Sequence, residues 1–263
     1  MRVLLLLAVV WPLAAADWGR VSVVNEGDRG ATLENSRIRV RYGRYEAKDD
    51  GPKEAIVELT ILPGGRNLAG RIDSRSANSS KGKANRLSSV SVAHDAVDRK
   101  TVHLDYGEGS AVQDVSIYPD APWIEITYFH HDVNVFDTAG PELVYEAFGA
   151  ADWAKSRGWQ ESYPAYPESY YRREWSPPGG LEYRGQFILG AYERATGLGY
   201  GRVMPVEHVD VVKLLFSRGF EMFPHYQPRR PQAAFTGYLF VVTGGAAEIL
   251  TRGKELAERV TKP

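Results

Sequence analysis

The sequence holds 263 residues, of which 32 are Lys or Arg and 33 are Asp or Glu, so its formal net charge at pH 7 is −1. This balance argues against general nucleic-acid binding, because proteins that bind phosphate backbones present strongly basic surfaces. The sequence contains no cysteine, which excludes disulfides, thiol catalysis and cysteine-ligated metals.

The first 16 residues have the pattern of a secretory signal peptide. Arg2 gives a positive start, residues 3–10 are apolar, and residues 14–16 are alanines typical of a cleavage site. The apolar run is too short to span a bilayer, and no second run of spanning length follows. We therefore expect a secreted or periplasmic protein that begins at Asp17 and has no stable membrane insertion after cleavage.

Alternation of apolar and polar residues predicts that strands dominate the rest of the chain. Ile38, Val40 and Tyr42 share one face of the first clear strand, with arginines on the other face. Residues 64–86 are polar and rich in glycine and serine, which predicts a long loop. Further strands are expected at residues 55–62, 87–93, 101–106, 111–118, 123–131, 183–192, 200–203, 208–216 and 235–243.

Turn and helix signals complete the predicted fold. Residues 119–122 (PDAP) predict a hairpin turn between two strands. After residues 243–245, Ile249 and Leu256 recur at helical spacing, which predicts one C-terminal helix. About ten to twelve strands with one helix indicate an all-β fold, a large antiparallel β-sandwich of supersandwich or jelly-roll type. We expect one domain over residues 17–263.

Three segments of the chain resemble one group of known folds. They are the opening strands ATLENSRIRVRYG, the hairpin SIYPDAPWIEITYFH and the closing strand FTGYLFVVTGG. Together they look like the β-supersandwich of galactose-mutarotase-like carbohydrate proteins, and the similarity is spread over most of the mature chain. That group includes sugar epimerases and domains of polysaccharide lyases and glycoside hydrolases. The resemblance implies a carbohydrate-related function, while the chemistry has to come from particular residues.

Residues 159–184, which begin WQESYPAYPESYYRREWSPPGG, are the stretch richest in candidate site residues. Their prolines oppose a long helix or a central strand, so we expect a long surface loop. Tyrosine, tryptophan and arginine suit stacking on sugar rings and binding of carboxylates. The alternative is that these aromatics only cover a sheet edge. The candidate proton carriers are Tyr170 and Tyr171, and the candidate substrate-binding residues are Tyr166, Arg172, Arg173, Trp175 and Arg184.

Two further segments add candidate histidines. Residues 223–231 (FPHYQPRRP) are bounded by prolines and carry His225, Tyr226 and Arg229, which we interpret as a second loop. The two loops would form one cleft if they met at one end of the sandwich; the alternative is an unrelated basic turn. His131 is the other candidate base. It is in phase with an amphipathic, cleft-like set on its strand, namely Trp123, Glu125, Thr127 and Phe129.

These residue types favour β-elimination at a uronic acid. Arginine would neutralise the carboxylate, and histidine or tyrosine would take the C5 proton. The leading hypothesis is thus a polysaccharide lyase acting on an anionic polysaccharide or oligosaccharide. The alternatives are a non-catalytic carbohydrate-binding module, which needs no base, or an epimerase or glycoside hydrolase on the same fold. A hydrolase needs two carboxylates at a set separation, and the candidates are Glu125, Asp152, Glu161, Glu168 and Glu174.

No cofactor or metal is expected from the sequence, and calcium is the alternative. Asp49 with Asp50, and Asp95 with Asp98, are acidic pairs that could bind it, although exposed acidic turns are usually only turns.

Overall fold

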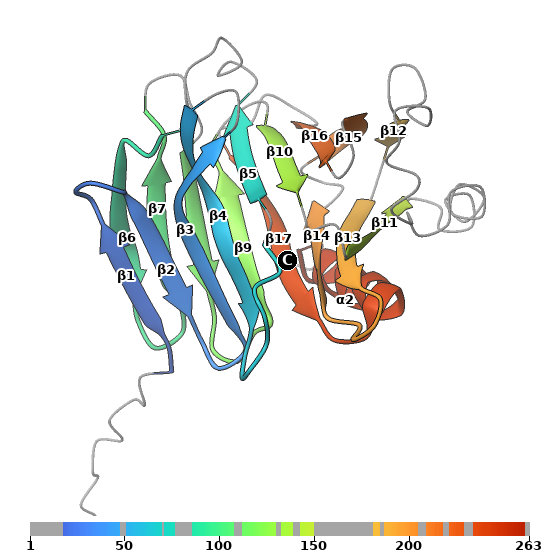
Figure 1. Cartoon of the computed structure of the whole chain (residues 1–263), viewed down its shortest axis with the longest axis horizontal. Coiled ribbons are helices and arrows are strands. Elements are labelled where there is room, and N and C mark those ends of the chain that lie inside the picture. Colours follow the sequence, from blue (N-terminus) through green and yellow to red (C-terminus); the bar gives the residue numbers. More distant parts are fainter. Residues whose placement is uncertain are drawn as a thin grey trace, which may run out of the picture.

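A computed structural model describes twelve segments of the chain, several of them by their backbone only. They are residues 18–47, 51–69, 71–76, 86–107, 112–129, 133–138, 143–149, 181–184, 187–204, 209–217, 221–228 and 234–260. The predicted signal peptide lies outside them. The described segments form seventeen strands in two antiparallel sheets and a C-terminal helix, which confirms the all-β prediction (Figure 1).

The first sheet has nine strands. Its order is β1 (Arg20–Val24), β2 (Gly30–Glu34), β3 (Ile38–Ala47), β4 (Gly51–Ile61), β5 (Arg71–Ser76), β10 (Val133–Thr138), β16 (Glu221–Pro228), β15 (Val209–Ser217) and β12 (Leu181–Arg184). The first four strands follow one another as antiparallel neighbours, whereas later strands join the sheet from distant parts of the chain.

The second sheet has eight strands. Its order is β11 (Leu143–Gly149), β13 (Phe187–Glu193), β14 (Gly199–Met204), β17 (Phe235–Val242), β9 (Trp123–Tyr128), β8 (Val112–Ile117), β7 (Lys100–Asp105) and β6 (Ser89–Asp95). Four of these strands, β6 to β9, form a meander of antiparallel hairpins. The last of those hairpins has the predicted turn over residues 119–122.

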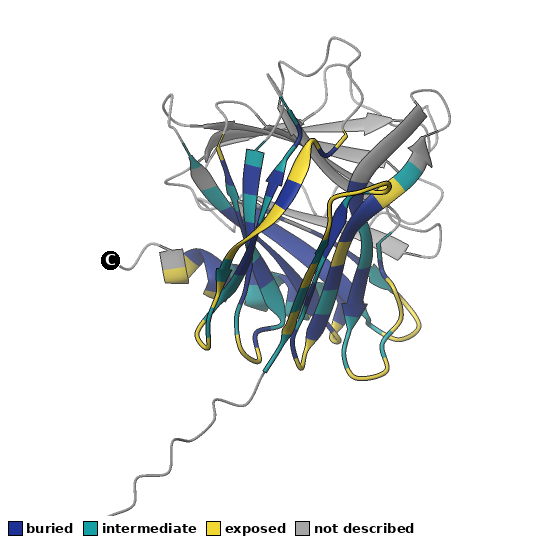
Figure 2. Cartoon of the chain, turned by 90° about the vertical axis from the view of Figure 1, so that its left-hand side faces the viewer, coloured by how far each residue is buried: buried dark blue, intermediate teal, exposed yellow. Residues whose placement is uncertain are grey.

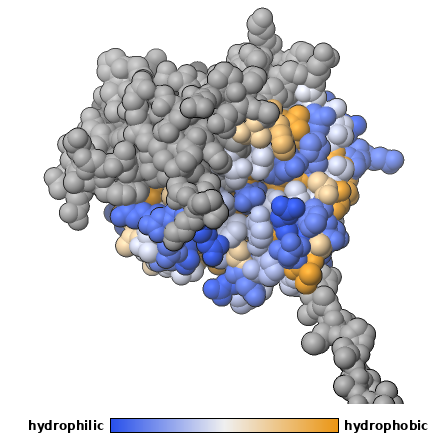
Figure 3. Space-filling model, turned by 180° about the vertical axis from the view of Figure 1, so that it is seen from behind, coloured by the Kyte–Doolittle hydropathy of each residue, from blue (hydrophilic) through white to orange (hydrophobic). Residues whose placement is uncertain are grey.

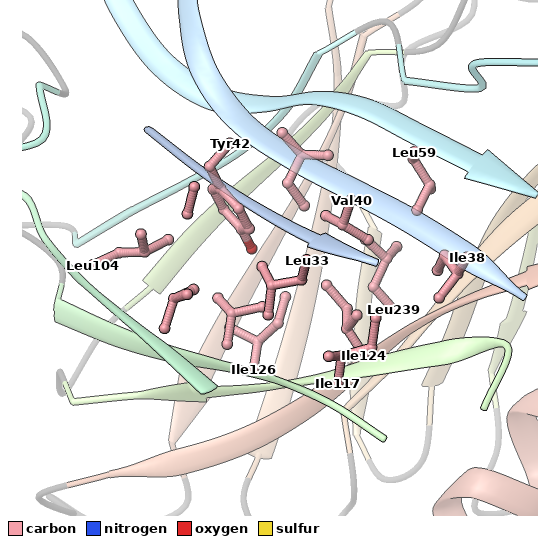
Figure 4. Close-up of a cluster of buried hydrophobic side chains, with 14 of the residues drawn as sticks. Leu33, Ile38, Val40, Tyr42, Leu59, Leu104, Ile117, Ile124, Ile126 and Leu239 are labelled. Atoms are coloured by element: carbon pink, nitrogen blue, oxygen red, sulfur yellow. The ribbon is translucent and has the colours of Figure 1, made fainter. Parts of the chain in front are cut away.

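The two sheets pack face to face, and the core lies between them. Burial alternates along most strands, with buried residues inside the sandwich and exposed ones at the turns and along the edge strands β1 and β6 (Figure 2). Side chains from β2, β3 and β4 meet side chains from β7, β8, β9 and β17 in this core (Figure 4). The contributing residues include Leu33, Ile38, Val40, Leu59, Leu104, Ile117, Ile124, Ile126 and Leu239. Their removal from water is the main stabilising contribution to the fold.

The C-terminal helix α2 (Gly245–Val260) covers part of the outer face of the second sheet. Ile249 and Leu256 are fully buried against Ile188 and Phe240, as the helical spacing predicted. The helix packs mainly on β13, β14 and β17, so the neighbouring part of this outer face, formed by β6 to β9, lies beside the helix (Figure 1). Among the described helices, none combines the length and the apolar content that crossing a membrane requires.

Three local predictions were wrong. The expected loop at residues 64–86 contains β5, and the expected strand at residues 183–192 is divided between β12 and β13, which belong to different sheets. The expected loop at residues 223–231 contains β16. This strand accommodates Pro224 because its pairing with β10 joins His225 to Asn134 and then Met222 to Asp137, leaving Phe223 and Pro224 out of that ladder.

Candidate functional site

The outer face of β9 carries the side chains from which we build the candidate site. Ile124, Ile126 and Tyr128 are buried in the core, while Trp123, Glu125 and Thr127 alternate with them and are half-buried. The sequence predicted this division from the period of two. The outer set is flanked by β8 on one side and β17 on the other, so residues of three strands meet around Trp123.

The turn between β8 and β9 is held in place by the other sheet. Asn35, which is only 4% exposed, lies in the turn between β2 and β3. Its amide nitrogen donates to the carbonyl oxygens of Tyr118 at 2.6 Å and Ala121 at 2.9 Å, and its amide oxygen accepts from the backbone N–H groups of Arg37 and Ile38. The turn itself needs Asp120 in the left-handed region, at φ 52°. Asn35 therefore fixes the turn that carries Tyr118.

Between this turn, β17 and α2 lies a cavity of about 520 Å³, which we call the aromatic cavity. This volume falls within the range of small-molecule pockets, roughly 300–1,000 Å³. Its main side chains are those of Tyr118, Trp123, Tyr238, Arg252, Glu255 and Arg259.

Aromatic rings form one side of the cavity. The ring centroids of Trp123 and Tyr118 are 4.8 Å apart with the planes tilted by 45°. Tyr238 meets Trp123 edge to face, at 5.5 Å and 85°. Both separations are in the range where aromatic pairs attract one another beyond the burial of their area. The indole is thus held in one orientation by a tyrosine on either side.

Glu125 joins the two tyrosines. Its Oε1 accepts a hydrogen bond from the Tyr118 hydroxyl at 3.2 Å, and its Oε2 accepts one from the Tyr238 hydroxyl at 3.0 Å. Burial, and then the Glu125 charge, raise the pKa of Tyr118 to about 12 and also raise the pKa of Tyr238. Both hydroxyls therefore stay protonated at neutral pH and act as donors, which makes either tyrosine a poor proton acceptor.

Two arginines of α2 lie at the cavity, and they differ in their partners. Arg252 forms ion pairs with Glu248 at 3.3 Å and Glu255 at 2.7 Å. The exposed Arg259 lies over the Trp123 ring, with 5.7 Å between its guanidinium carbon and the ring centroid. Within the described part of the chain, Arg259 forms no ion pair with a carboxylate. It is therefore the cation best placed to meet an anionic or polar group of a ligand.

Most of the candidate residues derived from the sequence lie outside the described residues. These are His131, Tyr166, Tyr170, Tyr171, Arg172, Arg173, Trp175 and Arg229. Arg184 lies in β12, and His225 and Tyr226 lie in β16, two strands away in the same sheet. The roles of all these residues stay predictions.

The strand register places His225 in a row of polar residues. It lies opposite Lys213 of β15 and Asn134 of β10; Lys213 lies opposite Glu182 of β12, and Asn134 lies opposite Arg75 of β5. Directly paired residues share one face of a sheet. The five residues therefore form one polar row across five strands.

Arg184 falls on the same face as this row. It pairs with Val211, which pairs with Gln227, two residues beyond His225. Tyr226 is opposite Val133 and Val212 and falls on the other face, because successive strand residues alternate. The fold thus brings Arg184 and His225 to one face and separates Tyr226 from them.

Other charged groups considered in the sequence have partners. Arg39 and Arg41 each lie 3.5 Å from a carboxylate oxygen of Glu58, so the arginine face of β3 is partly neutralised. Asp95 binds Lys100 at 2.6 Å. Among the described residues, no cluster of three or more metal-ligating side chains occurs. The acidic pair at residues 49–50 lies outside them, and a calcium site stays a prediction.

Sequence reasoning missed Tyr118, Tyr238 and Arg259, and did not single out Glu125 among the carboxylates. The alternation placed Glu125 beside Trp123 on one face. What distinguishes this carboxylate is its pairing with Tyr238, a residue 113 positions away, which only the register between β9 and β17 provides.

Comparison with known proteins gives only distant structural likenesses. No protein-family profile and no curated protein matches the chain. The YidC insertase is similar over 94% of this chain and 46% of its own, with 10% identity and a TM-score of 0.44. An aldose 1-epimerase from Klebsiella pneumoniae is similar over 92% and 87%, with 10% identity and a TM-score of 0.41.

A carbohydrate-active enzyme of another kind is also similar. The α-N-acetylgalactosaminidase of Bifidobacterium bifidum, in complex with GalNAc, is similar over 92% of this chain and 39% of its own, with 9% identity and a TM-score of 0.48. The chain thus spans less than half the length of the insertase and of this hydrolase. At such identities, the likeness gives no residue of this chain a role.

Proposed function

We propose that the protein binds carbohydrate and that one sugar ring occupies the aromatic cavity against Trp123. The observation that carries this proposal is the arrangement of Tyr118, Trp123 and Tyr238 around Glu125 beside a cavity of about 520 Å³. The apolar C–H face of a sugar packs on an indole, and the hydroxyls at its edge need hydrogen-bond partners.

The polar groups of the cavity match a ligand rich in hydroxyls. Glu125 lies behind the lining residues and accepts the hydroxyls of Tyr118 and Tyr238, and each of these two oxygens has a lone pair for a ligand hydroxyl. The Arg259 guanidinium, which lies over the indole ring, brings several N–H donors to the cavity. An arrangement of aromatic area with a few fixed polar groups is typical of specific small-molecule pockets.

The same groups favour binding over catalysis at this cavity. A general base works best when its pKa lies near the working pH, whereas the pKa of Tyr118 is raised to about 12. No histidine lines the cavity among the described residues. Of the carboxylates there, Asp120 accepts a hydrogen bond from Ser36 and Glu255 is paired with Arg252. A binding role needs none of these groups to move a proton.

A binding titration with a matched control tests this proposal. Neutral and acidic monosaccharides and oligosaccharides are titrated into the protein that begins at Asp17, and binding is measured by calorimetry. We expect Trp123→Ala to weaken binding about 30-fold, which corresponds to the roughly 2 kcal/mol typical of a central aromatic contact. Trp18→Ala is the control, because Trp18 is another partly buried tryptophan and is not one of the residues that line the cavity. Equal affinities for Trp123→Ala and wild type, or no sugar bound at all, would contradict the proposal.

A polysaccharide lyase is the second candidate, and the polar row through His225 favours it. In β-elimination, His225 would take the proton from C5 and Arg184 would bind the C6 carboxylate. The C4–O bond then breaks, a C4–C5 double bond forms, and the leaving oxygen takes up a proton. The test is the ultraviolet absorbance of the unsaturated product from acidic polysaccharides. Activity that is lost in His225→Ala and kept in His103→Ala supports the lyase, and no absorbance change on any acidic polymer contradicts it.

A further inference from the structure

The outer face of the second sheet carries polar residues beyond the aromatic cavity. One register row contains Thr101, Ser116, Glu125 and Tyr238, and the next contains His103, Asp114, Thr127 and Thr236. The two rows are two residues apart along every strand, so they share this face at a spacing of about 7 Å. The second row, which we call the polar strip, therefore borders the row that contains Glu125 of the candidate site.

The side chains of the polar strip are paired with one another and partly open to solvent. Nδ1 of His103 lies 2.6 Å from Oδ1 of Asp114, and their side chains are 37% and 30% exposed. The hydroxyls of Thr127 and Thr236 form a hydrogen bond at 3.1 Å. Each pair is held in a fixed arrangement, which lowers the entropy lost when a ligand binds.

An exposed aromatic residue stands at the far end of the strip. Phe129 follows β9, in phase with Trp123 and Thr127, and it is 39% exposed. Its backbone N–H donates to the Val112 carbonyl at 2.9 Å, so the pairing of β8 with β9 continues to this point. Phe129 is six positions beyond Trp123 along extended chain, a distance of about 20 Å. Polar side chains thus lie between two aromatic ones along a single strand.

We propose that this surface binds further sugar residues of an oligosaccharide or polysaccharide that runs along β9 from the aromatic cavity, over Thr127, to Phe129. The inference rests on the proposed function. The span of about 20 Å exceeds one sugar ring, and strip residues offer donors and acceptors that match sugar hydroxyls. Phe129 supplies a second apolar surface for a ring to pack against.

The composition of the surface favours a sugar chain over a protein partner. Protein interfaces have fully buried apolar centres with a polar rim. Here the centre is polar, formed by Asp114, Thr127 and Thr236, and the exposed aromatic Phe129 lies at one end. Seen from behind, the described surface is mainly hydrophilic, with hydrophobic residues in separate small groups (Figure 3).

Affinity as a function of chain length tests the inference. The sugar that binds the wild type is titrated as monosaccharide, disaccharide and longer oligomers. We expect affinity to rise about tenfold or more with length. Phe129→Ala and Thr236→Val should keep the wild-type affinity for the monosaccharide and lose at least about fivefold for the long oligomer. Thr32→Val, on the outer face of the other sheet, is the control and should change neither value. Circular dichroism checks that each variant is folded.

The outcomes separate the strip from the proposed function. Equal affinity for all lengths in the wild type, or an unchanged length dependence in both Phe129→Ala and Thr236→Val, overturns the role of the strip and leaves ring binding in the cavity intact. Failure of the wild type to bind a sugar of any length overturns the proposed function itself.

Discussion

Replacing Asn35 by alanine is expected to destabilise the protein strongly and to weaken the candidate site. The side chain is 4% exposed and forms four hydrogen bonds, two as donor and two as acceptor. Alanine removes all four and leaves the carbonyls of Tyr118 and Ala121, and the N–H groups of Arg37 and Ile38, without these partners. No other single side chain described here joins the β2–β3 turn of one sheet to the β8–β9 turn of the other through so many bonds.

The magnitude follows from the unpaired groups. Each buried polar group that loses its partner costs about 1–3 kcal/mol, less where water or a small backbone shift restores a bond. Two of the four bonds are buried and two are partly buried, so their loss with partial relaxation gives about 3–5 kcal/mol, which is at the upper end for point substitutions. For a chain of this size, such a loss lowers Tm by roughly 8–15 °C.

Urea unfolding followed by circular dichroism measures this loss. The control is Asn67→Ala, because exposed Asn67 also bonds only backbone groups, at Val57, Leu59 and Ala69. Water can replace those partners, so we expect its cost to be at most about 1–2 kcal/mol. A loss below about 1 kcal/mol for Asn35→Ala, or equal losses for the two variants, would refute the reasoning from burial.

Three further predictions concern other parts of the fold. Gly201→Ala should cost about 1–3 kcal/mol in urea unfolding, because an added Cβ would lie 2.2 Å from Cζ of the Phe240 ring; an unchanged midpoint would contradict this. The pKa of Tyr118 is raised from 10.0 to about 12, so its stabilisation is present below pH 10 and is lost as pH rises to 12. After allowance for partial exposure, this loss of unfolding free energy is about 1–2 kcal/mol. Tyr118→Phe should therefore lose less stability than the wild type between pH 10 and pH 12, measured by urea unfolding. An equally steep loss in the variant would contradict the assignment of this loss to Tyr118. Asn25 binds both the N–H and the carbonyl of Val90 on the edge strand β6, so Asn25→Ala should promote concentration-dependent association, measured by light scattering against the wild type.

The period-two patterns predicted much of the sandwich. Ile38, Val40 and Tyr42 are buried as expected, and the turn at residues 119–122 joins β8 and β9. These features depend on local sequence, because a strand with one buried face alternates apolar and polar residues. The C-terminal helix is equally local, since its apolar spacing and its glycine start lie within the segment itself.

The missed elements lack such a local signal. The strand β5 has the sequence RIDSRS, with Ile72 as its one apolar residue, and it is recruited by pairing with β4 and β10. The strand β16 contains Pro224, which has no backbone N–H and therefore argues against a central strand. The strand forms because Pro224 takes no part in the pairing of β16 with β10. In both cases, tertiary pairing decides the conformation.

The candidate site shows the same division. Alternation alone placed Trp123, Glu125 and Thr127 on one face. Tyr238 and Arg259 join them through the register of β17 and the packing of α2. No local sequence pattern predicts these long-range contacts. The strand register places His225 and Arg184 on one face of the first sheet, and their predicted roles stay proposals.

The most direct test of the central claim is a crystal structure of the protein with the sugar that binds it in solution. The account predicts a sugar ring against the indole of Trp123, with hydroxyls within hydrogen-bond distance of Tyr118 or Tyr238 and of Arg259. A sugar bound on the face of the His225 row, with the aromatic cavity free of it, would contradict the account and favour the lyase.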